Sequence, residues 1–253
     1  MENEYCYNEA ISRFYDPVYD KLEFLEPARK FYHDEILSVK GPVLEAGVGT
    51  GRIFLPALNE GADIYGVDVS ENMLNYLKMK LTDKQQFRIS IGDIRTFKPD
   101  RKYDLIISPF RVFQHLLTIE DQLNALHNIY DSLNDGGRYI FDVFYPDIKR
   151  LINDVDDILE FEGEIENGNV LKRFVSVRND TVKQIINVTF RFEWNENNNQ
   201  YKDEFYSPMR YFFRYELENL VGRTKFNLEK FYGSFECKDF GLNPKEQILI
   251  LRK

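Results

Sequence analysis

The sequence predicts an α/β fold in which a parallel sheet is covered by helices on both faces. Three observations lead to this prediction. Short apolar runs alternate with helical patterns between residues 41 and 146, and the first run ends in a glycine-rich turn, "VLEAGVGTGR", at residues 43–52. After Pro146 the pattern changes to residue-by-residue alternation before the earlier rhythm resumes. Strands that alternate with helices at this spacing are typical of a doubly wound sheet.

The first half of the chain contains five predicted strands, each a short apolar run. They are "GPVLEAG" (41–47), "ADIYGVDVS" (62–70), "FRISIGDI" (87–94), "KYDLIISPF" (102–110) and "RYIFDVFY" (138–145). Helical spacing of apolar residues predicts helices at 8–39, 52–61, 71–81 and 122–133. Ser70 is placed to cap the helix at 71–81, and Thr118 with Asp121 forms a capping-box-like pair before the last helix. "NDGG" at 134–137 ends that helix.

Residues 147–208 predict an antiparallel β insert within a single domain that spans residues 1–253. Val188, Phe190 and Phe192 alternate with polar residues, which is the pattern of a half-buried strand. Similar patterns occupy residues 170–178 and 201–209, whereas the acidic run at 153–166 reads as a solvated face. Beyond the insert we expect a helix at 214–223 and strands at 225–235 and 246–253.

Composition narrows the classes of partner. The chain has 253 residues and a formal net charge of −9, which disfavours binding to nucleic acid or to an anionic membrane. Two distant cysteines, Cys6 and Cys237, and three histidines without ligand spacing predict neither a disulfide framework nor a metal site. The acidic N-terminus does not resemble a signal peptide, and no apolar run approaches membrane-spanning length. We therefore expect a cytoplasmic protein.

The glycine turn departs from both common phosphate-binding patterns. No Lys-Ser or Lys-Thr pair follows its last glycine, and the glycine spacing is one residue shorter than that of the dinucleotide fingerprint. Glu45 lies inside the preceding strand, where a carboxylate would repel a pyrophosphate but attract an ammonium group. Asp68 and Asp93 end the next two strands, at positions suited to ribose hydroxyls and to an adenine amino group. The pattern favours a ligand with ribose, adenine and a positively charged amino-acid part.

In their order and spacing, these motifs resemble those of the class I S-adenosylmethionine-dependent methyltransferases, including the small-molecule members. "VLEAGVGTG", "GVDVSENML" and "GDIRTF" resemble the first three motifs, and "YDLIISPF" with "SLNDGGRYIFDV" resembles the later ones. The resemblance implies a Rossmann-like sheet of seven mostly parallel strands, with "EQILILRK" as its antiparallel last strand. It also implies S-adenosyl-L-methionine as cofactor and S-adenosyl-L-homocysteine as product.

The resemblance further implies a set of cofactor-binding residues. The glycines would admit the methionine and ribose parts, and the strand-end residues would hold the ribose and adenine. "FYDPVYD" resembles a lid, in which Tyr15 and Tyr19 would close over the cofactor. The alternatives are core packing for these tyrosines, a solvated position for Arg52 and a turn or cap role for the aspartates. The implied set comprises Glu45, Gly47, Gly49, Gly51, Arg52, Asp68, Val69, Met73, Asp93, Ile94 and Ser108.

Methyl transfer is an in-line displacement, so a base is needed only if the acceptor must lose a proton. Tyr15, Tyr19 and His115 are the candidates, although His115 could instead be a structural histidine. "SPF" at 108–110 departs from the Asn/Asp-Pro-Pro-aromatic motif of enzymes that methylate bases or amides. We expect a small-molecule acceptor, with nitrogen slightly favoured over oxygen. We expect the insert to wall the substrate site or to form a homodimer contact. The alternatives are a cofactor-binding protein without turnover and an NAD-dependent oxidoreductase, which the glycine spacing disfavours.

Overall fold

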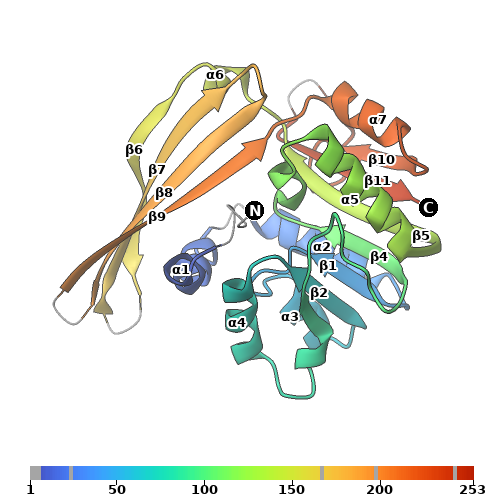
Figure 1. Ribbon diagram of the computed structural model, residues 1–253, viewed down its shortest axis with the longest axis horizontal. Coiled ribbons are helices and arrows are strands. Elements are labelled where there is room, and N and C mark those ends of the chain that lie inside the picture. The colour runs from blue at the N-terminus through green and yellow to red at the C-terminus, as the bar shows by residue number, and fades with distance from the viewer. Residues whose placement is uncertain (1–6, 23–24, 166–167, 197–198, 242–243) are drawn as a thin grey trace.

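A seven-stranded sheet forms the centre of the molecule (Figure 1). The computed structural model describes residues 7–22, 25–165, 168–196, 199–241 and 244–253. The strand order is β10-β11-β5-β4-β1-β2-β3, and β11 alone runs antiparallel to its neighbours. The predicted fold, including an antiparallel last strand, is confirmed. The strands are β1 (Val43–Ala46), β2 (Ile64–Asp68), β3 (Ile89–Ile91), β4 (Tyr103–Ser108), β5 (Leu133–Phe144), β10 (Asn227–Tyr232) and β11 (Glu246–Arg252).

Helices bury apolar side chains against both faces of this sheet. One core cluster joins the sheet to α5 and α7, through residues such as Leu126 and Leu217, and the other joins it to α2, α3 and α4. The predicted caps are present, because Ser70 accepts a hydrogen bond from Met73 N and Thr118 accepts one from Asp121 N. The helices are α1 (Glu9–Tyr19), α2 (Glu26–Leu37), α3 (Phe54–Asn59), α4 (Glu71–Lys80), α5 (Ile119–Ser132), α6 (Ile148–Leu151) and α7 (Arg214–Gly222), with 3-10 turns η2 (Gln86–Arg88) and η3 (Val112–His115).

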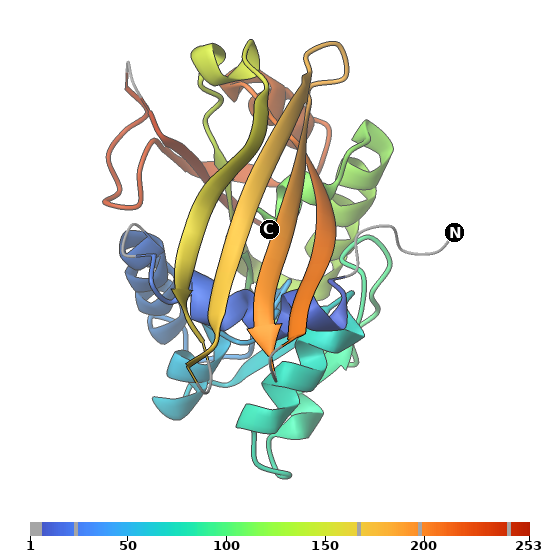
Figure 2. The same cartoon turned by 90° about the vertical axis from the view of Figure 1, so that its left-hand side faces the viewer.

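The insert is a four-stranded antiparallel sheet that stands beside the carboxyl ends of the central strands (Figures 1 and 2). Its strands follow in sequence order as β6 (Val155–Glu164), β7 (Val170–Asp180), β8 (Ile185–Glu196) and β9 (Asn199–Arg210). α1 crosses the inner face of this sheet, between it and the central sheet. The strands of the insert span residues 155–210.

The structure adds detail to two local predictions and corrects a third, the position of "NDGG". The acidic run at 153–166 contributes β6, an edge strand whose side chains are mostly exposed, so both faces of the strand lack the apolar alternation that would have revealed it. "NDGG" at 134–137 lies within β5 rather than before it, because the strand begins at Leu133 in register with Tyr103. The region predicted to be helical at 8–39 contains two helices, α1 and α2.

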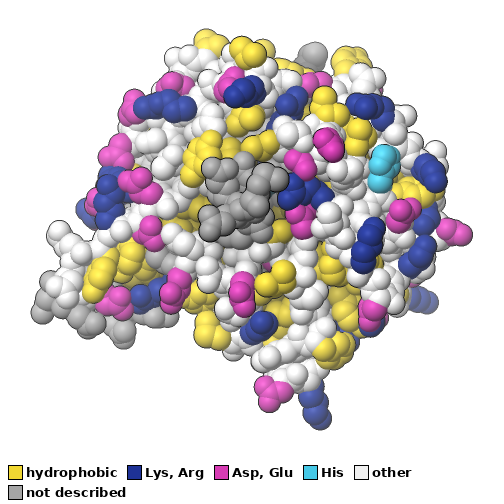
Figure 3. Space-filling view, in the orientation of Figure 1, with side chains coloured by type: hydrophobic (Ala, Val, Ile, Leu, Met, Phe, Trp, Pro, Cys, Tyr) yellow, Lys and Arg dark blue, Asp and Glu magenta, His cyan; other side chains and the backbone are white. Residues whose placement is uncertain are grey.

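Charged side chains of both signs intersperse on the face shown in Figure 3. Of the helices that the structure describes, none has the length and apolar character needed to cross a membrane. The same described residues contain no group of three or more His, Cys, Asp or Glu side chains positioned to hold a metal ion.

Candidate functional site

A cavity of about 610 Å³ opens at the carboxyl ends of the central strands. This is the edge of an open α/β sheet where ligands bind, and the volume lies in the range of small-molecule sites. The glycine turn forms one wall, η3 another, and β9 of the insert sheet closes the far side. The residues that line it are Tyr7, Tyr15, Glu45, Gly47, Val48, Gly49, Thr50, Arg52, Asp68, Val69, Met73, Gly92, Asp93, Ile94, Arg95, Pro109, Phe110, Val112, His115, Leu116, Leu117, Thr118, Asp121, Phe205, Tyr206 and Ser207.

The glycine turn uses its glycines for two different purposes. Gly47 has φ +84° and an added Cβ would lie 2.4 Å from Val112 Cγ2, so both conformation and space require glycine beside the cavity. Gly51 has φ +89°, but its Cβ position faces Leu77 Cδ1 at 2.5 Å, on the side of α4. Gly51 therefore lets the turn pack against α4, and it does not line the cavity as the resemblance implied.

Asp68 holds the turn from the end of β2. Its Oδ2 accepts a hydrogen bond from Gly49 N at 2.8 Å, and its Oδ1 accepts one from Ser70 N at 2.9 Å. Burial raises the pKa of Asp68, while these backbone hydrogen bonds oppose the rise. Each carboxylate oxygen has a second lone pair, so the side chain can still accept hydrogen bonds from a ligand in the cavity.

Glu45 and Arg52 carry polar atoms that lack hydrogen-bond partners among the described residues. Glu45 is 2% exposed and its Oε2 atom has no partner; Arg52 Nη1 is likewise buried without one. Burial raises the pKa of Glu45 well above its usual value, and the charge of Arg52 counteracts part of this rise. The Arg52 guanidinium lies 4.3 Å from the ring centre of Phe110 and 5.1 Å from that of Tyr15. Unpaired buried donors and acceptors at a cavity wall are suited to a ligand that carries the complementary groups.

Asp93 is paired with a neighbour rather than free for a ligand. Its carboxylate accepts two hydrogen bonds from Arg95 Nε, at 3.0 and 2.9 Å, and Arg95 Nη1 donates to Asp121 at 2.8 Å. Although burial pushes the pKa of Asp93 upward, the hydrogen bonds and charge of Arg95 lower it below the usual value. Val69, Met73 and Ile94 line the same end of the cavity. An apolar wall with an ion-paired carboxylate at its edge suits a planar heterocycle.

His115 is the titratable side chain on the η3 wall. Its Nδ1 lies 3.2 Å from the carbonyl oxygen of Pro208, which only accepts hydrogen bonds, so Nδ1 is the protonated nitrogen. Burial lowers the pKa of His115, and the hydrogen bond to Pro208 opposes the fall. The imidazole is therefore neutral near pH 7, with its remaining lone pair on Nε2.

The two lid tyrosines occupy different positions. Tyr15 lines the cavity, and burial raises its pKa to about 12 despite the nearby charge of Arg52. Tyr19 packs at a tilt against Tyr15, with ring centres 4.4 Å apart. The guanidinium groups of Arg173 and Arg52 lie 5.0 and 5.1 Å from its ring centre, and Tyr19 itself does not line the cavity. Ser108, which is fully buried at the end of β4, does not line the cavity either.

The turn after β4 has an unusual backbone. Phe110 and Arg111 have φ values of 56° and 74°, a conformation that side chains other than glycine rarely adopt. Asp142 of β5 accepts hydrogen bonds from Phe110 N and Arg111 Nη1, each at 2.9 Å. Tyr32 also donates to Asp142, at 2.6 Å, and Arg111 donates to Glu246 at 2.8 Å through Nη2. A lone aspartate among apolar residues in "RYIFDVFY" is the sequence signal that could have revealed this support.

Several other residues of the site were not predicted from the sequence. Apart from Thr50 in the glycine turn, they come from the N-terminal segment, from residues 110–117 around η3, and from β9, which reach the cavity only through the tertiary fold. The alternation along β9 identifies one face of a strand but does not say what that face meets. The unpredicted lining residues with side chains on these walls include Tyr7, Thr50, Phe110, Val112, Leu116, Leu117, Phe205, Tyr206 and Ser207.

Known proteins share both this segment and this fold. Residues 43–137 match the family model described as a methyltransferase domain. A malonyl-[acyl-carrier protein] O-methyltransferase of Ilyobacter polytropus is 29% identical over 181 residues, which are 68% of this chain and 58% of that protein. This chain thus matches little more than half the length of that relative.

Two solved structures cover nearly the whole chain. An S-adenosylmethionine-dependent methyltransferase from Clostridium acetobutylicum aligns with a TM-score of 0.76 at 15% identity, covering 96% of this chain and 97% of that one. A sugar N-methyltransferase from Streptoalloteichus aligns with a TM-score of 0.75 at 13% identity, covering 98% of this chain and 95% of that one. At these identities the likeness concerns the fold, including the insert sheet. Residues 43–137 are therefore similar to a methyltransferase domain, and the whole chain shares the fold of these two solved methyltransferases.

Proposed function

We propose that this protein transfers a methyl group from S-adenosyl-L-methionine to a small-molecule acceptor. The single observation that carries the proposal is that Glu45 Oε2 and Arg52 Nη1 both lack hydrogen-bond partners, in a cavity that Asp68 also lines. An α-amino group matches the Glu45 carboxylate, an α-carboxylate matches the Arg52 guanidinium, and ribose hydroxyls match Asp68. The family match and the fold support the same activity.

When bound, the cofactor supplies an electrophilic methyl group on a sulfonium. The chain's own residues bind and orient the reactants and keep water away from them. Tyr15, Phe110 and Phe205 give the cavity aromatic walls, and a cation is attracted to aromatic faces. The half of the cavity between η3 and β9 is left for the acceptor.

His115 is the best candidate for accepting a proton from the acceptor. It is neutral, lines the cavity and presents an unprotonated Nε2, whereas Tyr15 keeps its proton up to a pKa of about 12. Tyr19 does not reach the cavity. We favour an amine over a hydroxyl, because a neutral imidazole removes a proton from an ammonium far more readily than from an alcohol. The acceptor nitrogen then reacts as the neutral amine.

The insert sheet walls the acceptor half of the cavity in this proposal, because Phe205, Tyr206 and Ser207 of β9 line it. A homodimer contact through the insert remains the alternative use of this sheet. Light scattering of the purified protein distinguishes the two: a mass of about one chain supports the wall alone, and a mass of two chains supports a contact between copies.

Thermal-shift titration tests the cofactor. S-adenosylhomocysteine should raise the melting temperature, NAD should not, and Asp68→Ala should lose at least about tenfold in affinity for S-adenosylhomocysteine. Stabilisation by NAD alone would favour an oxidoreductase and contradict the proposal. Transfer of tritium from labelled S-adenosylmethionine to a pool of small amines and alcohols then separates an enzyme from a protein that binds the cofactor without turnover.

A further inference from the structure

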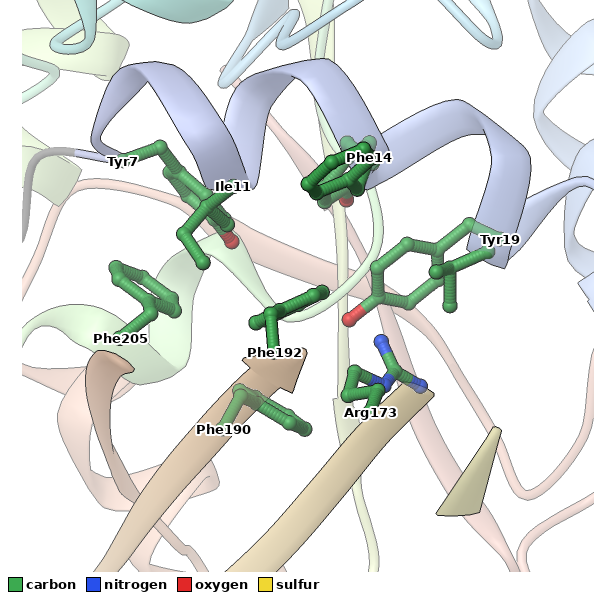
Figure 4. Close-up of a pocket in the computed structure, with 10 residues that line it drawn as sticks. Tyr7, Ile11, Phe14, Tyr19, Arg173, Phe190, Phe192 and Phe205 are labelled. Atoms are coloured by element: carbon green, nitrogen blue, oxygen red, sulfur yellow. The ribbon is translucent and has the colours of Figure 1, made fainter. Parts of the chain in front are cut away.

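α1 is attached to the insert sheet through apolar packing. Ile11, Phe14 and Val18 are at most 2% exposed and pack in one cluster with Leu171, Phe192 and Phe205 of the insert. Figure 4 shows side chains of α1 facing Phe192 and Arg173 across this contact. Asn8 and Arg13 add polar contacts to Asp203 and Glu196 of the same sheet. Burial of several large apolar side chains makes this the stronger attachment of the helix.

α1 meets the central sheet with its glycine turn and α4, which we call the cofactor half, mainly through polar contacts. Asp16 Oδ1 accepts a hydrogen bond from Thr50 Oγ1 at 2.5 Å, and Asp16 Oδ2 pairs with Lys80 Nζ at 2.5 Å. Lys80 Nζ also donates to the carbonyl oxygen of Thr50 at 2.9 Å. The carbonyl oxygen of Tyr7, just before α1, accepts a hydrogen bond from Asn72 at 2.9 Å. Such contacts can exchange with water at small cost, whereas the apolar packing cannot.

Thr50 makes this polar contact relevant to the site. It lies in the glycine turn, between Gly49 and Gly51, and is 1% exposed at the cavity wall. Asp16 and Lys80 hold its side chain and its backbone carbonyl from outside the cavity, while Asp68 holds Gly49 from the other side. Neither Asp16 nor Lys80 lines the cavity, so both act through Thr50 and through α1.

We propose that Asp16 and Lys80 form a latch between two bodies, the cofactor half and a unit made of α1 and the insert sheet. When the latch is closed, Tyr15 lies over Arg52 and the glycine turn is fixed. When it opens, α1 moves away together with the insert sheet and the cofactor exchanges. Asp16 is thus a positioning residue. The cofactor part of this inference rests on the proposed function, whereas the latch itself does not.

Three variants test the latch: Asp16→Asn, Lys80→Met and the double variant. Asp20→Asn is the matched control, because Asp20 closely follows α1 and pairs with Arg29 at an exposed position. Release of tritiated S-adenosylmethionine, chased with unlabelled cofactor, should be at least about fivefold faster than wild type in each single variant. The double variant should release the cofactor no faster than the single variants, because both changes break the same ion pair. Raising the salt concentration to about 0.5 M should speed release from the wild-type protein and leave both single variants unchanged.

Trp194 reports which body α1 follows. It is the only tryptophan in the chain, and its ring centre lies 4.9 Å from that of Phe14 in α1. The emission wavelength should stay the same in Asp16→Asn, because α1 remains on the insert sheet. A red shift would show that α1 has left the insert and would overturn the two-body division.

Hydrogen exchange tests the latch without any ligand. Amides at residues 47–52 should exchange faster in Asp16→Asn than in Asp20→Asn, with no change along β7–β9. Equal exchange in the two variants, or release rates equal to wild type, would overturn the latch. If wild-type protein binds no S-adenosylmethionine, the proposed function fails, and the exchange experiment still decides the latch.

Discussion

The side chain of Asp142 accepts a hydrogen bond from the backbone N–H of Phe110, 2.9 Å away on the neighbouring strand's turn. This bond holds Phe110 in a left-handed conformation that costs about 1–3 kcal/mol for such a residue. The ring of Phe110 then lies over the Arg52 guanidinium at the cavity wall. One buried carboxylate therefore connects the centre of the sheet to the orientation of a site residue.

Removing that carboxylate should be strongly destabilising. Asp142 is 1% exposed and accepts hydrogen bonds from Phe110, Arg111 and Tyr32. Asp142→Ala therefore removes the acceptor of three donors and leaves the half-buried Arg111 guanidinium paired with Glu246 alone. We expect the free energy of unfolding in urea to fall by about 3 kcal/mol or more. Asp34→Ala, which breaks an exposed ion pair with Lys30, should cost less than about 1 kcal/mol. Equal losses in the two variants would contradict the supporting role of Asp142.

Gly47→Ala should disrupt the glycine turn. The alanine would have to adopt φ +84°, and its Cβ would lie 2.4 Å from Val112 Cγ2. We expect a loss of at least about 1 kcal/mol in stability together with weaker binding of S-adenosylhomocysteine, measured by calorimetry. Gly222→Ala is the control, because no atom lies within 4 Å of its added Cβ. Wild-type affinity in Gly47→Ala would show that the turn does not approach the cofactor.

Cofactor binding should release a proton from Glu45. Its folded pKa is raised well above the usual value, so without ligand the carboxyl tends to stay protonated between about pH 4.5 and that raised pKa. An ammonium group beside it favours the carboxylate, so affinity should rise with pH across this window. Calorimetry in two buffers of different ionisation enthalpy measures the release. Glu45→Gln should abolish it, and the exposed Glu71→Gln should not.

His115 should weaken the fold in mild acid. Its folded pKa lies below the unfolded value of about 6.5, so below that pH the unfolded chain binds a proton that the folded chain resists. The free energy of unfolding should therefore fall as pH decreases from about 6.5. The fall should be smaller in His115→Gln than in the wild-type protein. His127→Gln is the control, because His127 is exposed on α5, and it should leave the fall unchanged. Denaturant titrations at several pH values measure the difference, and identical profiles would refute the buried neutral histidine.

The sequence predicts the central sheet well because buried parallel strands are continuous apolar runs between helical patterns. β1, β2, β4 and β5 all stand out in this way. β6 does not, because an edge strand exposed on both faces has no apolar pattern to reveal it. β6 forms by pairing with β7, a contact that depends on the tertiary structure.

The site residues likewise divide into those that local sequence patterns place and those that only tertiary packing places. Asp68 and Gly47 are predictable because strand ends and glycine turns place them locally. Ser108 and Gly51 lie close to cavity residues in sequence, but Ser108 is fully buried and a Cβ added to Gly51 would face Leu77 of α4. The pairing of Asp93 with Arg95 depends on side-chain rotamers that no spacing rule specifies. The role of Asp142 depends on the left-handed backbone conformation of Phe110, in the turn after the preceding strand of the chain, β4.

The placement of β11 has a consequence for synthesis on the ribosome. Residues 246–252 pair with both β5 and β10, yet they follow every other strand of the sheet in sequence. β5 emerges more than a hundred residues earlier, so one of its edges waits unpaired while the insert and α7 are translated. β10 cannot join the sheet at all until β11 arrives. Closure of this sheet is thus a late, long-range event, and the nascent chain exposes a hydrophobic strand edge until it occurs.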